Sequence, residues 1–283
     1  MKFLEKLLAI DRRIIFALVA VAIALPLFFK ANLKIDTTPE VERVYDIVEN
    51  LPEGSKVLLA FDYDPGSMPE LQPMAESFMR HCIRKKLKMI IMGLWPQGPI
   101  QANLALEKVI KEKEFRDVKL VEGVDWVNLG YAAGNEVVIE RMGSSIWAVF
   151  AADHKGVKLE DLPLMKGVRN FSNIDFIYEL SAGYPGTQEW VQFAVDKFGA
   201  KLGAGNTGVQ APLIYPFYPK QLLGFLGGMK GAAEYEVLMN TPALGVSYML
   251  SQSVAHALVC LFIIVGNIAF FLTRRKKQSG GQK

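Results

Sequence analysis

The stretch KVLLAFDYDPGSMPE, from Lys56 to Glu70, decides the predicted fold. It begins with a nearly continuous apolar run, which is typical of a strand buried on both faces. Asp62 and Asp64 end this run, Pro65-Gly66 predicts a turn, and Ser67 begins a helical pattern. A buried strand followed at once by a helix is the repeating unit of a parallel α/β sheet.

The same alternation recurs on both sides of this stretch. Buried strands are predicted at KMIIMGLWP (88–96) and NIDFIYELSAG (173–183), with short strands at 118–121 and 126–129 and a strand or turn at KLGAGNTG (201–208). Helices are predicted over 39–51, 67–84, 97–113, 135–142 and 187–199, and a long helical pattern covers 221–239. We therefore predict a three-layer α/β domain with a doubly wound, mostly parallel sheet.

Two segments without Asp, Glu, Lys or Arg flank this domain, Ile14 to Phe29 and Val254 to Leu272. The second is long enough to cross the ~30 Å hydrocarbon core of a bilayer. The first is slightly short, but Ala31, Leu33 and Ile35 extend it past Lys30. The bulky stretch Pro26-Leu27-Phe28-Phe29 does not fit a signal-peptidase site, which needs small residues, so we expect an uncleaved anchor.

Basic residues predict how these two segments are oriented. Lys2, Lys6, Arg12 and Arg13 precede the first segment, and Arg274, Arg275, Lys276 and Lys277 follow the second. Positive charge favours the cytoplasmic side, so both termini are expected there. The predicted organisation is a first span at 1–35, an extracytoplasmic domain at 36–248, and a second span with a basic tail at 249–283.

The composition limits which functions to consider. The chain of 283 residues has a net charge of only +3, and much of its basic excess lies in the tails, so nucleic-acid binding has no support. Cys82 and Cys260 are not expected to meet in a disulfide. With three histidines and no metal, phosphate-loop or nucleophile-elbow motif, we predict no metal site and no cofactor.

The acidic pair Asp62 and Asp64 allows two interpretations. A strand that ends in Asp-x-Asp resembles the first motif of haloacid-dehalogenase-type phosphatases, in which the first Asp is the nucleophile and the second the acid/base. This chain departs from that motif at Gly66, where the family has Thr. The other interpretation is that the two carboxylates bond loop amides beside Pro65-Gly66.

The stretch GAGNTG, from Gly203 to Gly208, matches the letters of a dinucleotide-binding fingerprint but not its context. Pro212 and Pro216 follow it, so no long helix opens on the last glycine, and no suitable acid occurs ~20 residues further on. We expect a glycine-rich ligand loop or a tight turn.

Four Gly/Pro-rich loops are expected to meet at the carboxyl edge of the sheet, where open α/β sheets bind ligands. Their aromatic, hydroxyl, amide and acidic side chains have the composition of a small-molecule pocket. The candidate ligand-binding residues are Asp62, Asp64, Ser67, Trp95, Gln97, Ser181, Tyr184, Asn206 and Thr207.

Contacts with the membrane or a partner protein are expected from two places. His256 and Asn267 are polar groups inside the second apolar segment, where a polar side chain needs a partner. The apolar, aromatic stretch 213–229, with Phe217, Tyr218 and Phe225, fits either an interface or a buried core helix.

The stretches FDYDPGSMPEL, WPQGP, ELSAGYPG and LGGMKGAAEYE resemble an uncharacterised family of bacterial two-span membrane proteins with an extracytoplasmic α/β domain. This resemblance implies the cytoplasmic (inner) membrane of a bacterium and supplies no catalytic residues. More loosely, the alternation is similar to the flavodoxin-like and class I glutamine-amidotransferase-like sandwiches of ABC-transport auxiliary proteins. The amidotransferase cysteine is missing, because Ser181 or Asn206 stands at the strand-to-helix turns.

The function that we expect is a membrane-anchored module that binds a small ligand or a partner protein, as an accessory or scaffold subunit of a larger membrane assembly. Expected partners are the lipid bilayer and a membrane protein or a second copy of the chain. The alternative is an enzyme, a metal-assisted phosphatase-like hydrolase that uses Asp62 and Asp64.

Overall fold

The computed structural model describes residues 10–28, 35–241 and 243–280. The chain divides into two units, which are described separately below. One is the α/β domain Lys34–Val246, and the other combines Met1–Leu33 with Ser247–Lys283.

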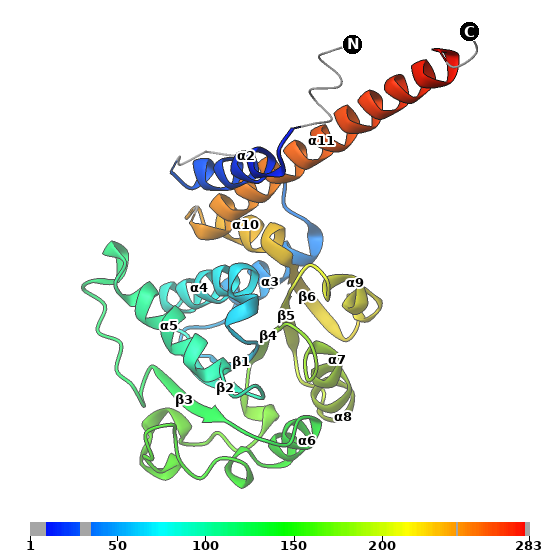
Figure 1. The fold of residues 1–283 in the computed structure, drawn as a ribbon. Helices are drawn as coiled ribbons and strands as arrows, with labels where there is room; N and C mark the ends of the chain where they lie inside the picture. Colours follow the sequence, from blue (N-terminus) through cyan, green and yellow to red (C-terminus); the bar gives the residue numbers. More distant parts are fainter. Residues whose placement is uncertain (1–9, 29–34, 242, 281–283) are drawn as a thin grey trace. The chain divides into compact units, whose positions relative to one another are not determined.

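The domain is built on one sheet in which every strand pairing is parallel (Figure 1). Its strands are β1 (Lys56–Asp62), β2 (Lys88–Gly93), β3 (Trp126–Tyr131), β4 (Phe176–Ser181), β5 (Leu202–Asn206) and β6 (Leu222–Gly227). Their order in the sheet is β3-β2-β1-β4-β5-β6. The predicted doubly wound α/β fold is confirmed, and the order reverses between β1 and β4.

Alternate residues of the central strands enter two separate cores. In β1, Val57, Leu59 and Phe61 pack on one face of the sheet, while Leu58 and Ala60 pack on the other. A strand covered on both faces cannot alternate apolar with polar residues, which explains the continuous apolar run.

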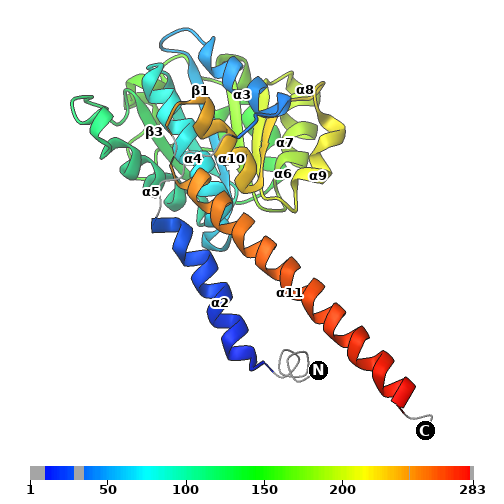
Figure 2. The ribbon, with the colours of Figure 1, turned by 90° about the horizontal axis from the view of Figure 1, so that it is seen from above.

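Four helices cover the first face. They are α3 (Pro39–Glu49), α4 (Met68–Arg84), α5 (Gly98–Ile110) and α10 (Gly228–Leu238). Helices α3, α4 and α10 lie side by side over the sheet (Figure 2). Pro39 and Pro69 stand in the first turns of α3 and α4, where a missing N–H costs nothing.

The second face carries shorter helices and irregular turns. The regular elements are α6 (Glu136–Ser144), α7 (Thr187–Trp190), α8 (Asp196–Phe198) and α9 (Ala211–Ile214), with the π-helical turn η8 (Val191–Val195) between α7 and α8. Gly199 ends α8 at φ +68°, a conformation that favours glycine. The predicted helix at 187–199 is therefore present but contains a π turn.

Two sequence-based predictions are wrong. Residues 118–121 form no named strand, and the pattern 221–239 is not one helix but β6 followed by α10. Gly224 lets α3 approach β6, since a Cβ there would lie 2.6 Å from the carbonyl oxygen of Glu40. Gly228, at φ +58°, makes the turn into α10.

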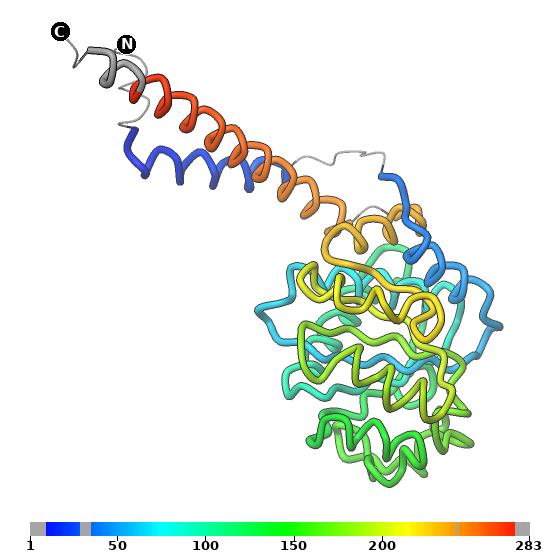
Figure 3. Tube along the Cα trace, turned by 90° about the vertical axis from the view of Figure 1, so that its right-hand side faces the viewer, coloured from blue at the N-terminus to red at the C-terminus, as the bar shows by residue number. Residues whose placement is uncertain are grey.

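Among the residues that the structure describes, one helix has the length and composition to cross a membrane, α11 (Leu244–Gly280). Its coloured part runs without a break in Figure 3. Helix α2 (Arg12–Ala24) has 13 residues and continues as the 3₁₀ turn η1 (Leu25–Phe28) beside Pro26. Of the two expected flanking spans, the described residues therefore show one candidate, α11, because α2 alone is shorter than the roughly 20 residues of a spanning helix. Lys2, Lys6 and residues 29–34, used in that expectation, lie outside the described residues.

Candidate functional site

The carboxyl ends of β1, β4 and β5 place three polar residues at one edge of the sheet. Asp62 pairs in register with Ser181, and Ser181 with Asn206. This edge contains the point where the strand order reverses, which is where open α/β sheets bind their ligands. The sequence-based prediction that these residues share an edge is confirmed.

Asp62 is fully buried and has a hydrogen-bond partner for each of its oxygens. Its Oδ1 accepts from the backbone N–H of Leu94 at 2.6 Å, and its Oδ2 accepts from Nε1 of Trp190 at 2.9 Å. Burial raises the pKa of Asp62 to about 7, although these two hydrogen bonds oppose the rise. The carboxyl group therefore ties three segments of the edge together.

Asp64 and Ser67 contribute to the turn after β1. The Asp64 carboxylate accepts from the N–H of Gly66 at 2.9 Å and caps the 3₁₀ turn η2 (Pro65–Ser67). Ser67 is the N-cap residue of α4 and makes no side-chain capping bond. Asp64 thus bonds a loop amide beside Pro65-Gly66, as that interpretation predicts, whereas Asp62 bonds Leu94 and Trp190 instead.

Beside Asp62 lies a buried cluster of four polar side chains: Glu179, Ser181, Thr187 and Asn206. The Thr187 hydroxyl donates to Glu179 Oε2 at 2.5 Å, and Asn206 Nδ2 lies 2.8 Å from Thr187 Oγ1 and 3.1 Å from Ser181 Oγ. Burial first, and then the charge of Asp62, raise the pKa of Glu179 well above its ordinary value. Burial therefore disfavours the charged form of Glu179.

Two oxygens of this cluster lack hydrogen-bond partners among the residues that the structure describes. They are Glu179 Oε1 and Asn206 Oδ1, both buried. A buried carbonyl oxygen without a donor costs roughly 1–3 kcal/mol, so such groups in native proteins call for an explanation.

One of these two residues, Asn206, lines a cavity of about 170 Å³. Asn206 and Thr187 line it from the sheet edge, and the remaining lining residues come from the loops after β4 and β5: Gly183, Tyr184, Gln188, Glu189, Gln210 and Ile214. This volume is below the roughly 300–1,000 Å³ of sites for drug-sized molecules, so the cavity fits a small ligand.

Of the other predicted ligand-binding residues, Trp95 and Tyr184 lie at this edge. Trp95 Nε1 donates to the carbonyl of Pro185 at 3.1 Å, and the Tyr184 hydroxyl donates to Glu136 at 2.7 Å. Thr207 is buried next to Asn206. Gln97 is exposed at the N-cap of α5 and does not line the cavity.

The glycines of GAGNTG are explained by packing. A Cβ on Gly205 would lie 2.6 Å from Leu180 Cδ2, and one on Gly203 would lie 2.5 Å from Phe176 Cζ. Both residues are inside β5, and the helix that follows, α9, has four residues. Gly203 and Gly205 therefore serve strand packing and form neither the ligand loop nor the tight turn expected from the sequence.

The residues predicted to contact a membrane or a partner have different environments. Phe225 is a core residue of β6 with 1% exposure, packed edge-on against Tyr215 and Tyr218, so its prediction as a contact is wrong. Phe217 and Tyr218 are half-buried. His256 and Asn267 are exposed on α11, and Asn267 Nδ2 donates to the carbonyl of Ile263 in its own helix at 2.8 Å.

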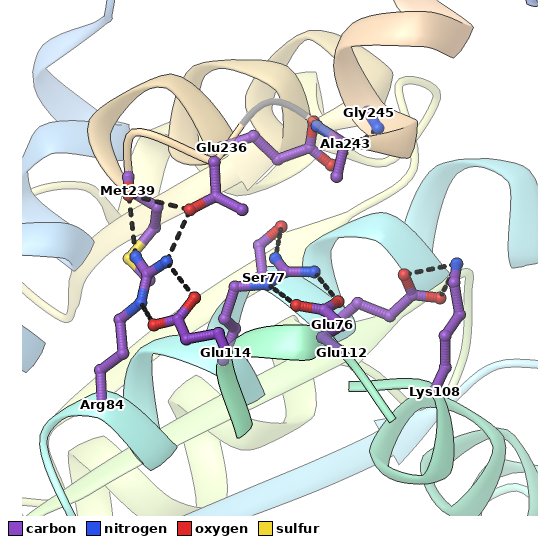
Figure 4. A network of polar contacts seen from close by, with 12 residues as sticks. Glu76, Ser77, Arg84, Lys108, Glu112, Glu114, Glu236, Met239, Ala243 and Gly245 are labelled. Carbon is purple, nitrogen blue, oxygen red and sulfur yellow. Dashed lines mark hydrogen bonds and ion pairs between the residues drawn. The ribbon is translucent and has the colours of Figure 1, made fainter. Parts of the chain in front are cut away.

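A separate polar network joins α4 and α10 to the start of α11 within the domain (Figure 4). Arg84 forms a bidentate ion pair with Glu114 and donates to the carbonyl of Met239 at 2.8 Å. Glu236 accepts from the backbone N–H groups of Ala243, Gly245 and Val246 at 2.7–2.9 Å. Because these N–H groups lie at the first turn of α11, Glu236 acts as its cap.

Sequence reasoning missed most of the cavity lining and the acid beside it. Thr187, Gln188 and Gln210 line the cavity, and Glu179 lies beside it. Glu179 had a usable signal, because it is one acid inside the otherwise apolar strand FIYELS. The two glutamines had none, since their role depends on how the loops after β4 and β5 fold together.

Comparisons with known proteins give no information on function, which therefore has to be inferred from the fold and the geometry of the site. No protein-family model, curated protein or solved structure matches this chain.

Proposed function

We propose that this chain is a membrane-anchored binding protein whose α/β domain holds a small ligand with N–H donors at the carboxyl edge of its sheet. The observation that carries the proposal is Asn206, which lines a cavity and whose Oδ1 is a buried acceptor without a hydrogen-bond partner among the described residues. An N–H donor from a ligand would satisfy it.

The charges around the cavity narrow the ligand class. No Lys or Arg is among the described residues that line it, whereas Glu189 is. Gln188 and Gln210 add side-chain amides, which both donate and accept. Small amines and amides therefore fit better than phosphates or carboxylates, for which arginine and lysine are the usual partners.

The test is a thermal-shift series on the full-length protein in mild detergent. Ethanolamine, glycinamide and acetamide are compared with acetate and inorganic phosphate, on wild type, Asn206→Leu and Gln210→Ala. A ligand at 100 times its Kd stabilises by about 2.7 kcal/mol, which is about 5–10 °C in Tm for a domain of this size.

We expect that shift for an amine or amide on wild type, a loss of it in Asn206→Leu, and a reduction in Gln210→Ala. Gln221→Ala is the matched control, since this glutamine bonds Asp196 outside the cavity. If every compound shifts the Tm of wild type and of Asn206→Leu equally, the cavity is not the binding site.

Anchoring is the second part of the proposal. Many large apolar side chains of α11 are exposed, among them Ile263, Ile264 and Phe271, which suits a helix surrounded by lipid. Helix α2 and η1 together rise about 28 Å, close to the ~30 Å bilayer core, and would form an anchor at the other end. In this arrangement both termini are in the cytoplasm of a bacterium and the domain lies across its inner membrane.

A cysteine placed in the domain tests this topology. Cys82 is buried, so Glu160→Cys in a Cys260→Ala background gives one accessible thiol among the described residues of the domain. An impermeant maleimide should label it in intact spheroplasts. Labelling only after lysis would place the domain in the cytoplasm.

The role as an accessory or scaffold subunit of a larger membrane assembly completes the proposal. The exposed positions of His256 and Asn267 on α11 support it, because polar groups at such depth gain from a partner. Purification from native membranes in a gentle detergent, followed by mass spectrometry, should recover a stoichiometric membrane protein. That partner should be lost from a His256→Leu, Asn267→Leu variant, and a wild-type chain that purifies alone would refute this role.

A further inference from the structure

We propose that Glu122, Asp153 and His154 form a binding site for one divalent transition-metal ion, separate from the cavity at the sheet edge. Each residue offers one ligand atom, and these atoms lie within 4.8 Å of one another. Glu122 comes from the turn before β3, and the other two come from the loop that closes through the bridge between Ala152 and Lys158.

The orientation of His154 is the first argument. Its Nδ1 lies 3.0 Å from the backbone carbonyl of Asn128. A carbonyl oxygen only accepts, so Nδ1 must carry the hydrogen, and in the neutral ring Nε2 keeps its lone pair. Metal-binding histidines characteristically donate their other N–H to a carbonyl or carboxylate, which fixes the tautomer. Asn128 is buried in β3, so the sheet itself holds this acceptor in place.

The environment of Asp153 is the second argument. The side chain is 7% exposed, and its Oδ1 accepts from the backbone N–H groups of Lys155 at 2.9 Å and Val157 at 2.8 Å. These bonds fix the carboxylate and leave Oδ2 without a bond to any described residue. A carboxylate held in this way would lose little side-chain entropy on binding a metal ion.

Glu122 supplies the third argument. Its Oε1 is buried and has no hydrogen-bond partner in the part of the chain that the structure describes, while Oε2 pairs with the ammonium group of Lys155. A shielded carboxylate oxygen is costly without a donor or a cation. The two carboxylates carry one more negative charge than the Lys155 ammonium balances, which favours binding of a cation.

The donor set narrows the class of metal. One imidazole nitrogen with two carboxylate oxygens suits zinc and similar transition ions, which accept three protein ligands and keep a fourth position open. Magnesium prefers an all-oxygen shell that retains several waters. Ligand atoms at 2.0–2.2 Å from one zinc ion lie within 4.8 Å of one another, as the three donor atoms do here.

This inference does not depend on the proposed ligand cavity. Strand β3 is at one end of the sheet, three strands away from β4, which is about 14 Å at the usual spacing. A failure of either proposal leaves the other unchanged.

The test measures Zn²⁺ binding to full-length, chelator-washed protein in detergent by competition with a chromophoric chelator, with Mg²⁺ as the comparison ion. We expect one tight Zn²⁺ per chain and no comparable Mg²⁺ binding. His154→Ala and Glu122→Gln should each weaken Zn²⁺ binding at least tenfold, because loss of a direct ligand costs no less than the 10–100-fold lost with a second-shell partner. Lys155→Ala should bind Zn²⁺ more tightly, since it removes the competing cation.

Glu160→Gln is the matched control, an exposed acid of the same loop region that pairs with Lys158 and should leave the affinity unchanged. A variant is counted as folded if its Tm without metal equals that of wild type without metal. The proposal is overturned if wild type binds no stoichiometric Zn²⁺, or if folded His154→Ala and Glu122→Gln bind it as tightly as wild type does.

Discussion

The substitution Asp62→Asn tests the account of the sheet edge through the dependence of stability on pH. Burial raises the pKa of Asp62 from 3.8 to about 7 in the folded protein. Between these values the folded state binds a proton that the unfolded state has lost, so the free energy of unfolding falls as pH rises. A difference of about 3 pKa units corresponds to about 4 kcal/mol. This stability is present below pH 4 and is lost as pH rises through about 7.

The asparagine side chain of the variant does not titrate, so its contribution to the free energy of unfolding does not change with pH. At pH 4 it should be less stable than wild type by about 1–3 kcal/mol, because its amide accepts only one of the two hydrogen bonds from Leu94 and Trp190. By pH 8 the wild type should have lost about 4 kcal/mol relative to the variant.

The assay is urea unfolding of the full-length protein in detergent, followed by tryptophan fluorescence at fixed pH values from 4 to 8. Trp190 contacts Asp62 directly and reports on this edge. Asp64→Asn is the matched control, since this carboxylate lies two residues away and caps a surface turn. Parallel stability curves for wild type and Asp62→Asn would refute the reasoning about burial.

Three further substitutions have definite expectations. Gly205→Ala should lower stability by about 1–3 kcal/mol in urea unfolding, because the new Cβ would lie 2.8 Å from the Tyr178 hydroxyl oxygen, whereas an unchanged value would contradict the packing role. Arg80→Ala should cost about 3 kcal/mol in the same assay, because it breaks a bidentate pair of the buried guanidinium with Glu112; a loss below 1 kcal/mol would show that the pair is dispensable. Glu236→Ala should cost about 0.5–2 kcal/mol and speed amide exchange at residues 243–246, and unchanged exchange there would show that the carboxylate does not cap α11.

The layered fold was predictable because its signals are local. Each central strand is a short apolar run that ends in a Gly, Pro or Asp turn, and each following helix begins at a recognisable signal such as the prolines of α3 and α4. Such patterns depend on burial of both sheet faces and on backbone chemistry, which the residues themselves determine.

The strand β6 was missed because its pattern is ambiguous. The sequence QLLGFLGGMKGAAEYEVLM places small and apolar residues at spacings that fit a helix as well as a strand. Packing decides the outcome, since Gly224 admits the backbone of α3 and Phe225 fills the opposite core. Short apolar segments are where periodicity alone fails.

Only part of the candidate site could be predicted from the sequence. Parallel strands bring their carboxyl ends together, so Asp62, Ser181 and Asn206 could be placed at one edge from the sequence. The hydrogen bond from Trp190 to Asp62 joins residues 128 positions apart. No local pattern encodes such a contact, and the same holds for the meeting of Glu122 with Asp153 and His154.

The central claim is that the cavity beside Asn206 holds a small ligand with N–H donors. Native mass spectrometry of the full-length protein, purified from its own membranes in mild detergent, tests this most directly. The account predicts that wild type carries a small bound molecule with an amine or amide group, and that folded Asn206→Leu does not. The claim would be contradicted if the same molecule were bound to both proteins, or if wild type carried no such molecule.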